Sequence, residues 1–160
     1  MKRRRFLGAV GCTAGGAIAA SLLPEAALAQ AAPVFAQQAD SDALVKSVTR
    51  GREAKTGRVK LELPILADNG NSVPMKVTVE SPMTESDHVR TIWLLSERNP
   101  ERDMATFHLG PRAGAAEIAS RVRLAGSQRV VALAEMSDGS YWMGTADVTV
   151  TLSACVDGTG

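Results

Sequence analysis

From residue 59 onward, apolar and polar residues alternate with a period of two, and this pattern most constrains what the chain can fold into. Successive side chains of a β-strand point to opposite faces, so alternation predicts strands with one buried face. Val59, Leu61 and Leu63, for example, are separated by charged residues. About seven strands are predicted by this pattern, over residues 59–63, 75–80, 89–95, 104–109, 117–124, 129–136 and 141–152.

Two of these segments define how the strands are arranged. Residues 89–95 are apolar on both faces, which is typical of a central strand in a sandwich. Asp138-Gly139 stands between the last two segments and is a strong hairpin signal. Short strands separated by frequent turns predict an all-β fold, an antiparallel β-sandwich of immunoglobulin-like type. The Cys…Trp…Cys signature of true immunoglobulin domains is absent from the sequence, so the term describes the layers only.

A short amphipathic helix is expected before the strands. Asp40 or Ser41 is a suitable N-cap, and Gly51 is a suitable end. Residues 30–39 are expected to be a flexible segment that precedes this helix. The apolar face of the helix would consist of Leu44, Val45 and Val48.

The first 29 residues have the three parts of a secretory signal. Arg3 and Arg4 lie in a basic start of the twin-arginine (Tat) type, an apolar run follows, and Ala27-Leu28-Ala29 is a small-x-small cleavage site. Glycines and Pro24 interrupt the apolar run, so a retained membrane anchor is the less favoured interpretation. The predicted location is the periplasm. Four parts are therefore expected: a signal peptide (1–29), a mature N-terminal segment with the short helix (30–57), a β-sandwich domain (58–152) and a flexible C-terminal arm (153–160).

Removal of the signal changes the charge of the chain. It takes away four of the 18 basic residues and one of the 17 acidic residues, so the mature protein has a net charge of −2. The mature chain therefore gives no indication of a nucleic-acid or anionic-lipid partner.

Cleavage also leaves a single cysteine. Cys12 belongs to the signal, and Cys155 is the only thiol that remains in a compartment where thiols normally pair. An unpaired cysteine in an exported protein points to an intermolecular bond or to a reactive thiol. The alternative is an incidental free cysteine, which is usually buried, and the position of Cys155 near the chain end argues against burial.

Other chemistry has little support in the sequence. His88 and His108 are twenty residues apart without a metal-binding motif, and both are expected in loops or on strand surfaces. No phosphate-binding loop, Cys-x-x-Cys or Gly-x-Ser-x-Gly motif is present. No cofactor or metal is therefore expected. The close carboxylate pairs lie in turn-like segments and are interpreted as solvated loop charges; they are Glu85 with Asp87 and Glu101 with Asp103.

The aromatic residues are few. Trp93 and Phe107 are expected in the core. Tyr141 and Trp142 are adjacent in a strand and must face opposite sides, so one of the two is expected to be exposed, either as a partner anchor or without a role.

The neighbours of Cys155 do not activate its thiol. Ser153, Ala154, Val156 and Asp157 supply no cation or base that would lower its pKa, and Asp157 disfavours the thiolate. Small neighbours on a terminal arm suit a thiol that is inserted into the active site of another protein. The expected function is that of a covalent carrier and not of an enzyme.

Several segments together resemble the SoxY family, the sulfur-carrier subunit of the periplasmic thiosulfate-oxidising Sox system. The resemblance extends from about residue 42 to Cys155. Its motifs are Leu61-Glu-Leu-Pro64, Asn69-Gly-Asn-Ser-Val-Pro74, Val79-Glu-Ser-Pro-Met83, Glu97-Arg-Asn-Pro100, Ala105-Thr-Phe-His108 and Val131-Ala-Leu-Ala-Glu-Met-Ser-Asp-Gly-Ser140.

The resemblance implies a heterodimer with a SoxZ-like subunit and attachment of the sulfur substrate to Cys155. It implies transient contacts with a haem enzyme (SoxAX) that joins thiosulfate to the thiol and with a hydrolase (SoxB) that releases sulfate. A sulfane dehydrogenase is a further partner that the family allows. The usual family ending is Gly-Gly-Cys-Gly-Gly, whereas Ser153, Ala154, Val156 and Asp157 flank the cysteine here. This arm is expected to be stiffer and bulkier near the thiol.

Two other functions are consistent with the same residues. The chain could be a SoxY-like carrier for another periplasmic oxidation system. It could also be a non-catalytic β-sandwich binding or assembly module in which Cys155 is incidental or forms a disulfide-linked dimer.

Overall fold

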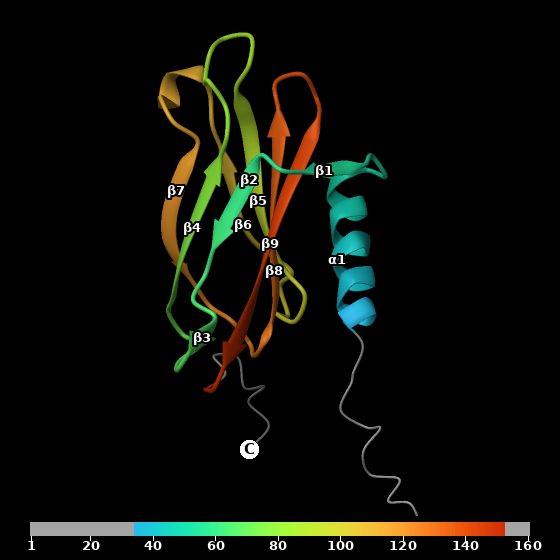
Figure 1. Cartoon of the computed structure of the whole chain (residues 1–160), viewed down its shortest axis with the longest axis vertical. Coiled ribbons are helices and arrows are strands. Elements are labelled where there is room, and N and C mark those ends of the chain that lie inside the picture. Colours follow the sequence, from blue (N-terminus) through green and yellow to red (C-terminus); the bar gives the residue numbers. More distant parts are fainter. Residues whose placement is uncertain (1–33, 153–160) are drawn as a thin grey trace, which may run out of the picture. The chain divides into compact units, whose positions relative to one another are not determined.

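The computed structural model of the protein describes residues 34–152 (Figure 1). The predicted signal peptide over residues 1–29 and the predicted arm over residues 153–160 lie outside the described residues. Cys155 and its four flanking residues belong to that arm, so the fold is described up to the point where the arm begins.

The described residues form two β-sheets and one long helix, which confirms the predicted sandwich. The larger sheet has the order β1-β9-β8-β5-β6, with β3 also paired to β9, and the smaller sheet has the order β2-β4-β7. The elements are α1 (Val34–Thr49), β1 (Ala54–Thr56), β2 (Val59–Glu62), β3 (Leu66–Ala67), β4 (Val73–Val79), β5 (Val89–Ser96), β6 (Asp103–His108), a 3-10 turn (Pro111–Ala113), β7 (Glu117–Val122), β8 (Gln128–Met136) and β9 (Tyr141–Val150).

The main core lies between the two sheets and follows the predicted alternation. β4 places Val73, Met75, Val77 and Val79 inward, and β5 is the central strand expected from its composition, with β8 and β6 on its two sides. The Asp138-Gly139 turn joins β8 and β9 into an antiparallel hairpin, with φ of 81° at Gly139.

The outer face of the larger sheet has a second core beneath α1. Val45 of the helix packs with Leu95, Val131, Leu133 and Tyr141, and all five side chains are buried. Figure 1 shows α1 on the side of the larger sheet that faces away from β4 and β7. The helix therefore buries an outer sheet face that an isolated sandwich would leave in water.

The expectation that Tyr141 or Trp142 is exposed is wrong. The two rings do face opposite sides of β9, but each side is covered. Tyr141 is buried under α1, whereas Trp142 is half-buried and packs against the core between the sheets. Trp93 and Phe107 are also half-buried against these two cores.

The helix starts earlier than expected. It begins at Val34, so residues 34–39 are helical and neither Asp40 nor Ser41 is its N-cap. Alanine and glutamine dominate this stretch and favour helix, and Pro33 precedes the first helical residue. Ser41 instead donates a hydrogen bond to the Glu97 side chain in the loop after β5.

The helix ends at the predicted place, although Gly51 is not alone in reversing the chain. Arg50 and Gly51 have φ of 55° and 82°, and the Gly51 N–H donates to the Lys46 carbonyl at 2.9 Å. This bond and the left-handed residue after the last helical turn form a Schellman motif. Arg50 occupies the position where glycine is usual.

Two short strands were not predicted and pair in parallel with β9. β1 pairs its residues 54–56 with residues 141–143, and β3 pairs Leu66 with Thr149 and Ala67 with Val150. β1 lies before residue 58, the predicted start of the sandwich. Within the described residues, both ends of β9 thus have an extra strand beside them, whereas its middle does not.

The middle of β9 lies against β2 of the other sheet. A Cβ atom on Gly144 would collide with the backbone carbonyl of Val59. Glycine is required here because the two sheets approach within backbone contact.

Candidate functional site

The predicted site residue, Cys155, and its flanking residues Ser153, Ala154, Val156 and Asp157 lie outside the described residues. The nearest described part of the molecule is the end of β9, from Thr149 to Leu152, which we call the arm root. Because Cys155 follows Leu152 by three residues, the arm root determines where the thiol is attached to the fold.

Backbone hydrogen bonds to the segment that contains β3 hold the arm root. The Thr149 N–H donates to the Ile65 carbonyl at 2.8 Å, and the Thr151 N–H donates to the Ala67 carbonyl at 3.1 Å. The Leu152 carbonyl accepts a bond of 2.7 Å from the Gly70 N–H. The backbone is thereby fixed as far as the last described residue.

Two hydroxyl groups add to this anchoring. Thr151 donates from its side chain to the Asp68 carbonyl at 2.8 Å. Ser127, in the turn before β8, accepts from the Val150 N–H at 2.9 Å and lies 3.4 Å from the Val150 carbonyl, to which it donates. The hydroxyls at the arm root therefore hold the backbone and do not form a nucleophile–base pair.

A polar cluster behind the arm root connects the loops at this end of the sandwich. Buried Ser96 donates to the buried Gln128 side chain, and the amide of Gln128 donates to Asn99 Oδ1 at 3.0 Å. Asn99 also accepts from the Ala125 N–H at 2.9 Å and donates to the Arg123 carbonyl at 2.8 Å. A satisfied buried network of this kind fixes one arrangement of its loops.

The sequence did not predict this cluster. Asn99-Pro100 was interpreted as a turn signal only, and neither Ser96 nor Gln128 was given a role. The available signal was the Glu97-Arg-Asn-Pro100 segment, which the family resemblance singled out. A connection from Asn99 to the arm root is present in the structure, because Leu124 next to Arg123 donates from its N–H to the Gly70 carbonyl at 2.8 Å.

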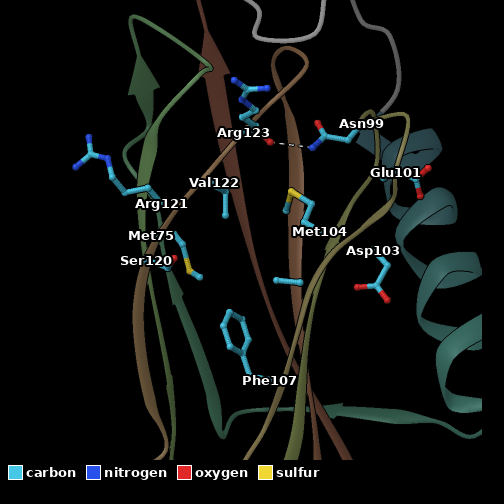
Figure 2. Close-up of a pocket in the computed structure, with 11 residues that line it drawn as sticks. Met75, Asn99, Glu101, Asp103, Met104, Phe107, Ser120, Arg121, Val122 and Arg123 are labelled. Carbon is cyan, nitrogen blue, oxygen red and sulfur yellow. Dashed lines mark hydrogen bonds between the residues drawn. The ribbon is translucent and has the colours of Figure 1, made fainter.

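The sandwich is open along its other side, between β6 and β7. Figure 2 shows a groove there of about 410 Å³, into which the side chains of Met75, Met104 and Phe107 point. Arginines lie on the β7 side, and carboxylates lie on the β6 side. The described residues that line it are Met75, Asn99, Glu101, Asp103, Met104, Ala105, Phe107, Ser120, Arg121, Val122 and Arg123.

This groove has an apolar floor and a charged rim. Among the described residues, neither a histidine nor a cysteine lines it, so no nucleophile–base pair of that kind is formed there. Arg121 is bound to Ser72, with Nε 2.6 Å from Oγ, so one of the two arginines that line the groove has a structural partner.

The two histidines lie where the sequence predicted. His88 is in the loop before β5, with Nδ1 3.0 Å from the Thr84 carbonyl oxygen, and exposed His108 ends β6, with Nδ1 3.3 Å from Thr91 Oγ1. Within residues 34–152, no three His, Cys, Asp or Glu side chains are grouped so that they could hold a metal ion.

The arrangement of anchored arm root, sandwich and covering helix matches a known family. Residues 43–155, more than half of the chain, match the family model described as sulfur oxidation protein SoxY. The chain belongs to the SoxY family. The match ends on Cys155, so the predicted site residue is inside the region shared with the family.

Solved structures with this fold include a SoxY protein. The sulfur carrier protein SoxY from Chlorobium limicola f thiosulfatophilum is 21% identical, with a TM-score of 0.56, and the match covers 72% of this chain and 99% of that chain. No curated protein sequence matches the chain. Membership of the SoxY family places the protein in sulfur oxidation, with the role of a sulfur carrier.

Superoxide reductases share the fold as well. A variant of the superoxide reductase (neelaredoxin) of Ignicoccus hospitalis is 16% identical, with a TM-score of 0.54, and the match covers 68% of this chain and 86% of that chain. The superoxide reductase of Nanoarchaeum equitans is 13% identical, with a TM-score of 0.51, and the match covers 60% and 100% of the two chains. At such identities the likeness concerns the fold alone.

The helical content of this SoxY-family chain bears on membrane insertion. In the part of the chain that the structure describes, no helix has the length and apolar character needed to span a bilayer.

Proposed function

We propose that this protein is a periplasmic carrier that holds thiosulfate-derived sulfur covalently on Cys155 and presents it to the Sox enzymes. The observation that carries the proposal is the family match, which extends to Cys155. Two further facts support it: Cys155 is the only cysteine after the predicted cleavage site, and the described fold ends three residues before it on a strand end held by hydrogen bonds.

The first step is oxidative loading of the thiol. The Cys155 thiolate and thiosulfate form one sulfur–sulfur bond and lose two electrons, which gives a Cys155–S–S–SO3− adduct. The thiol has no activating neighbour in its own sequence, so a haem enzyme of the SoxAX kind would take up the two electrons.

The second step releases sulfate without a change in oxidation state. Water attacks the sulfonate sulfur, the bond between the two outer sulfur atoms breaks, and hydrogen sulfate leaves a Cys155 persulfide behind. A SoxB-like hydrolase would catalyse this step. A sulfane dehydrogenase would then remove six electrons from the outer sulfur while three waters supply its oxygens, and a second hydrolysis would restore the thiol.

Export and partnership follow from the same proposal. The Arg3-Arg4 pair and Ala27-Leu28-Ala29 support export through the Tat pathway to the periplasm. A SoxZ-like subunit would form a heterodimer with the chain. The carrier itself would supply no catalytic group.

The residues around Cys155 favour one variation of this function. Ala154 and Val156 replace the glycines that usually flank the family cysteine, so the standard active-site channels would meet more bulk. A SoxY-like carrier for another periplasmic oxidation system is the second candidate. Exchange of both residues for glycine would distinguish the two, because it would speed turnover by SoxB only in a chain adapted to other enzymes.

Intact-mass measurement tests the carrier function. The protein is purified without reductant from cells grown on thiosulfate, and adducts with the masses of S-sulfonate, S-thiosulfonate or persulfide are expected. Cys155→Ser should carry no adduct, whereas the control Ser153→Ala should carry the same adducts as the natural protein. An unmodified Cys155 thiol under all these conditions would refute the proposal.

A further inference from the structure

Large apolar side chains are exposed at one end of the sandwich. Among the described residues, the large hydrophobic side chains that stand out in water are Ile65, Leu66 and Leu152, with exposed fractions of 84%, 56% and 66%. Single exposed apolar residues are normal on a protein surface, but an exposed group of them marks an interaction site. These three residues belong to the same corner, because Ile65 and Leu66 lie on the segment that pairs with Thr149 and Val150. We call them the collar.

The collar stands on a rigid backbone. Ile65 and Ala67 each accept a hydrogen bond from the arm root, and Leu152 accepts one from Gly70. Within β3, Ala67 is buried in the core while Leu66 points to solvent. The exposure of the collar is therefore imposed by strand alternation on a fixed strand, and the three side chains are held ready for a contact.

The length of the arm relates the collar to the thiol. Cys155 is three residues beyond Leu152, and an extended residue spans at most ~3.6 Å, so its Cα lies no more than ~11 Å from that of Leu152. Ile65 is bonded to Thr149, three residues before Leu152, which corresponds to ~10 Å along the strand in the opposite direction. A protein that encloses the thiol must therefore cover the ground on which the collar lies.

We propose that Ile65, Leu66 and Leu152 are the docking surface for the enzyme whose active site takes up Cys155, in particular the hydrolase that releases sulfate from the loaded thiol. The inference rests on the proposed carrier function and names the surface that this function uses. The occupant presents an apolar rim around the mouth of its active-site channel. The arm inserts into the channel, and the collar seals the rim, so binding energy comes from residues remote from the reacting sulfur.

Kinetics of sulfate release test the docking surface. The mature protein is loaded chemically with tetrathionate: the Cys155 thiolate attacks a central sulfur, thiosulfate leaves, and the Cys155–S–S–SO3− adduct forms. A purified SoxB-like hydrolase from the same genome then releases sulfate. The double variant Ile65→Ser/Leu66→Ser should raise KM about tenfold or more with little change in kcat, because the collar contacts the enzyme away from the sulfur.

Matched controls separate docking from other effects. Glu85→Ser/Ala113→Ser changes two exposed residues in loops remote from the arm root and should leave KM unchanged. The rate of Cys155 alkylation by a small maleimide should be the same in all variants, since it reports access to the thiol without docking. Leu152→Ser provides a second, independent variant on the other side of the collar and should also raise KM.

Three results would overturn the inference. Unchanged KM in both collar variants would show that the enzyme docks elsewhere. Loss of a SoxZ-like partner or of a homodimer from the double variant, measured by light scattering, would assign the collar to a permanent subunit interface. A natural protein that loads on Cys155 but is not hydrolysed would end the collar proposal and leave covalent carriage standing, whereas failure to load would refute the carrier function itself.

Discussion

The two ends of strand β9 are held in different ways. At its start, Tyr141 is buried against α1, its ring centroid lies 6.3 Å from that of Trp93, and the Arg52 guanidinium carbon is 5.0 Å from the ring centroid. At its end, backbone and hydroxyl hydrogen bonds hold Thr149 to Leu152, and Leu152 points its side chain into water.

The difference shows how one strand can both stabilise a domain and present a functional arm. Side-chain burial stabilises the start and makes that end unavailable to a partner. Hydrogen bonds at the other end order the backbone without using the apolar side chains. The end that leads to Cys155 is therefore fixed in position but remains open to contact.

The largest stability effect is expected at the buried start of β9. Tyr141→Ala should lower the free energy of unfolding by about 3 kcal/mol, because it leaves a cavity beneath α1. Tyr141→Phe is the control and should cost much less, since it removes only the hydroxyl, which lies 3.4 Å from Arg52 Nη2. Urea unfolding followed by tryptophan fluorescence measures both. Equal effects of the two variants would mean that ring burial is not what holds this end.

The middle of β9 should be the next most sensitive position. Gly144→Ala places a Cβ against the Val59 backbone, and we expect about 2 kcal/mol of destabilisation because neither strand can move freely. Gly110→Ala is the matched control, since its added Cβ meets nothing within 4 Å and its φ of −150° suits any residue. The same urea titration should show a change only for Gly144→Ala.

Hydrogen bonding at the arm root should contribute less than burial at the start. Ser127→Ala removes the hydroxyl that bonds Val150, and a loss of about 1–2 kcal/mol is expected because the Val150 N–H is left without this acceptor. Amide hydrogen exchange should show faster exchange at Val150 in this variant. Exposed Ser120, changed to alanine, serves as the control. Unaltered exchange at Val150 would contradict the anchoring role of Ser127.

Exposed Leu152 should hardly affect stability. Leu152→Ala is expected to change the free energy of unfolding by less than about 0.5 kcal/mol, because the side chain is in water before and after the substitution. Thermal unfolding of the variant beside Tyr141→Ala tests the contrast directly. A large loss would show that the collar is part of the core.

A small pH effect should be confined to the hairpin turn at the start of β9. The pKa of Asp138 is lowered because Ser140 donates hydrogen bonds to the carboxylate from its side chain and from its backbone N–H. A lowered folded-state pKa means that this stabilisation is present above the unfolded pKa of ~3.9 and disappears as the pH falls through the folded value. The effect is shallow because Asp138 is exposed. Asp138→Asn should flatten the stability profile between about pH 2 and pH 5, whereas an identical profile would contradict the role of this turn.

The sequence by itself determined the parts of the molecule that depend on local pattern. Alternation predicted the long strands, two-sided apolar composition predicted the central place of β5, and Asp138-Gly139 predicted the hairpin, because strand period and turn chemistry are properties of neighbouring residues. Cys155 was identified in the same way, since it is the one thiol left after the predicted signal is removed.

The tertiary structure alone decided what depends on residues far apart in the chain. β1 and β3 are too short to show a period, and they are strands only because β9 offers its free edge. Tyr141 is buried because a helix from much earlier in the chain covers that face. The collar likewise arises when Ile65 and Leu66 are brought beside the arm root, and no local pattern contains that contact.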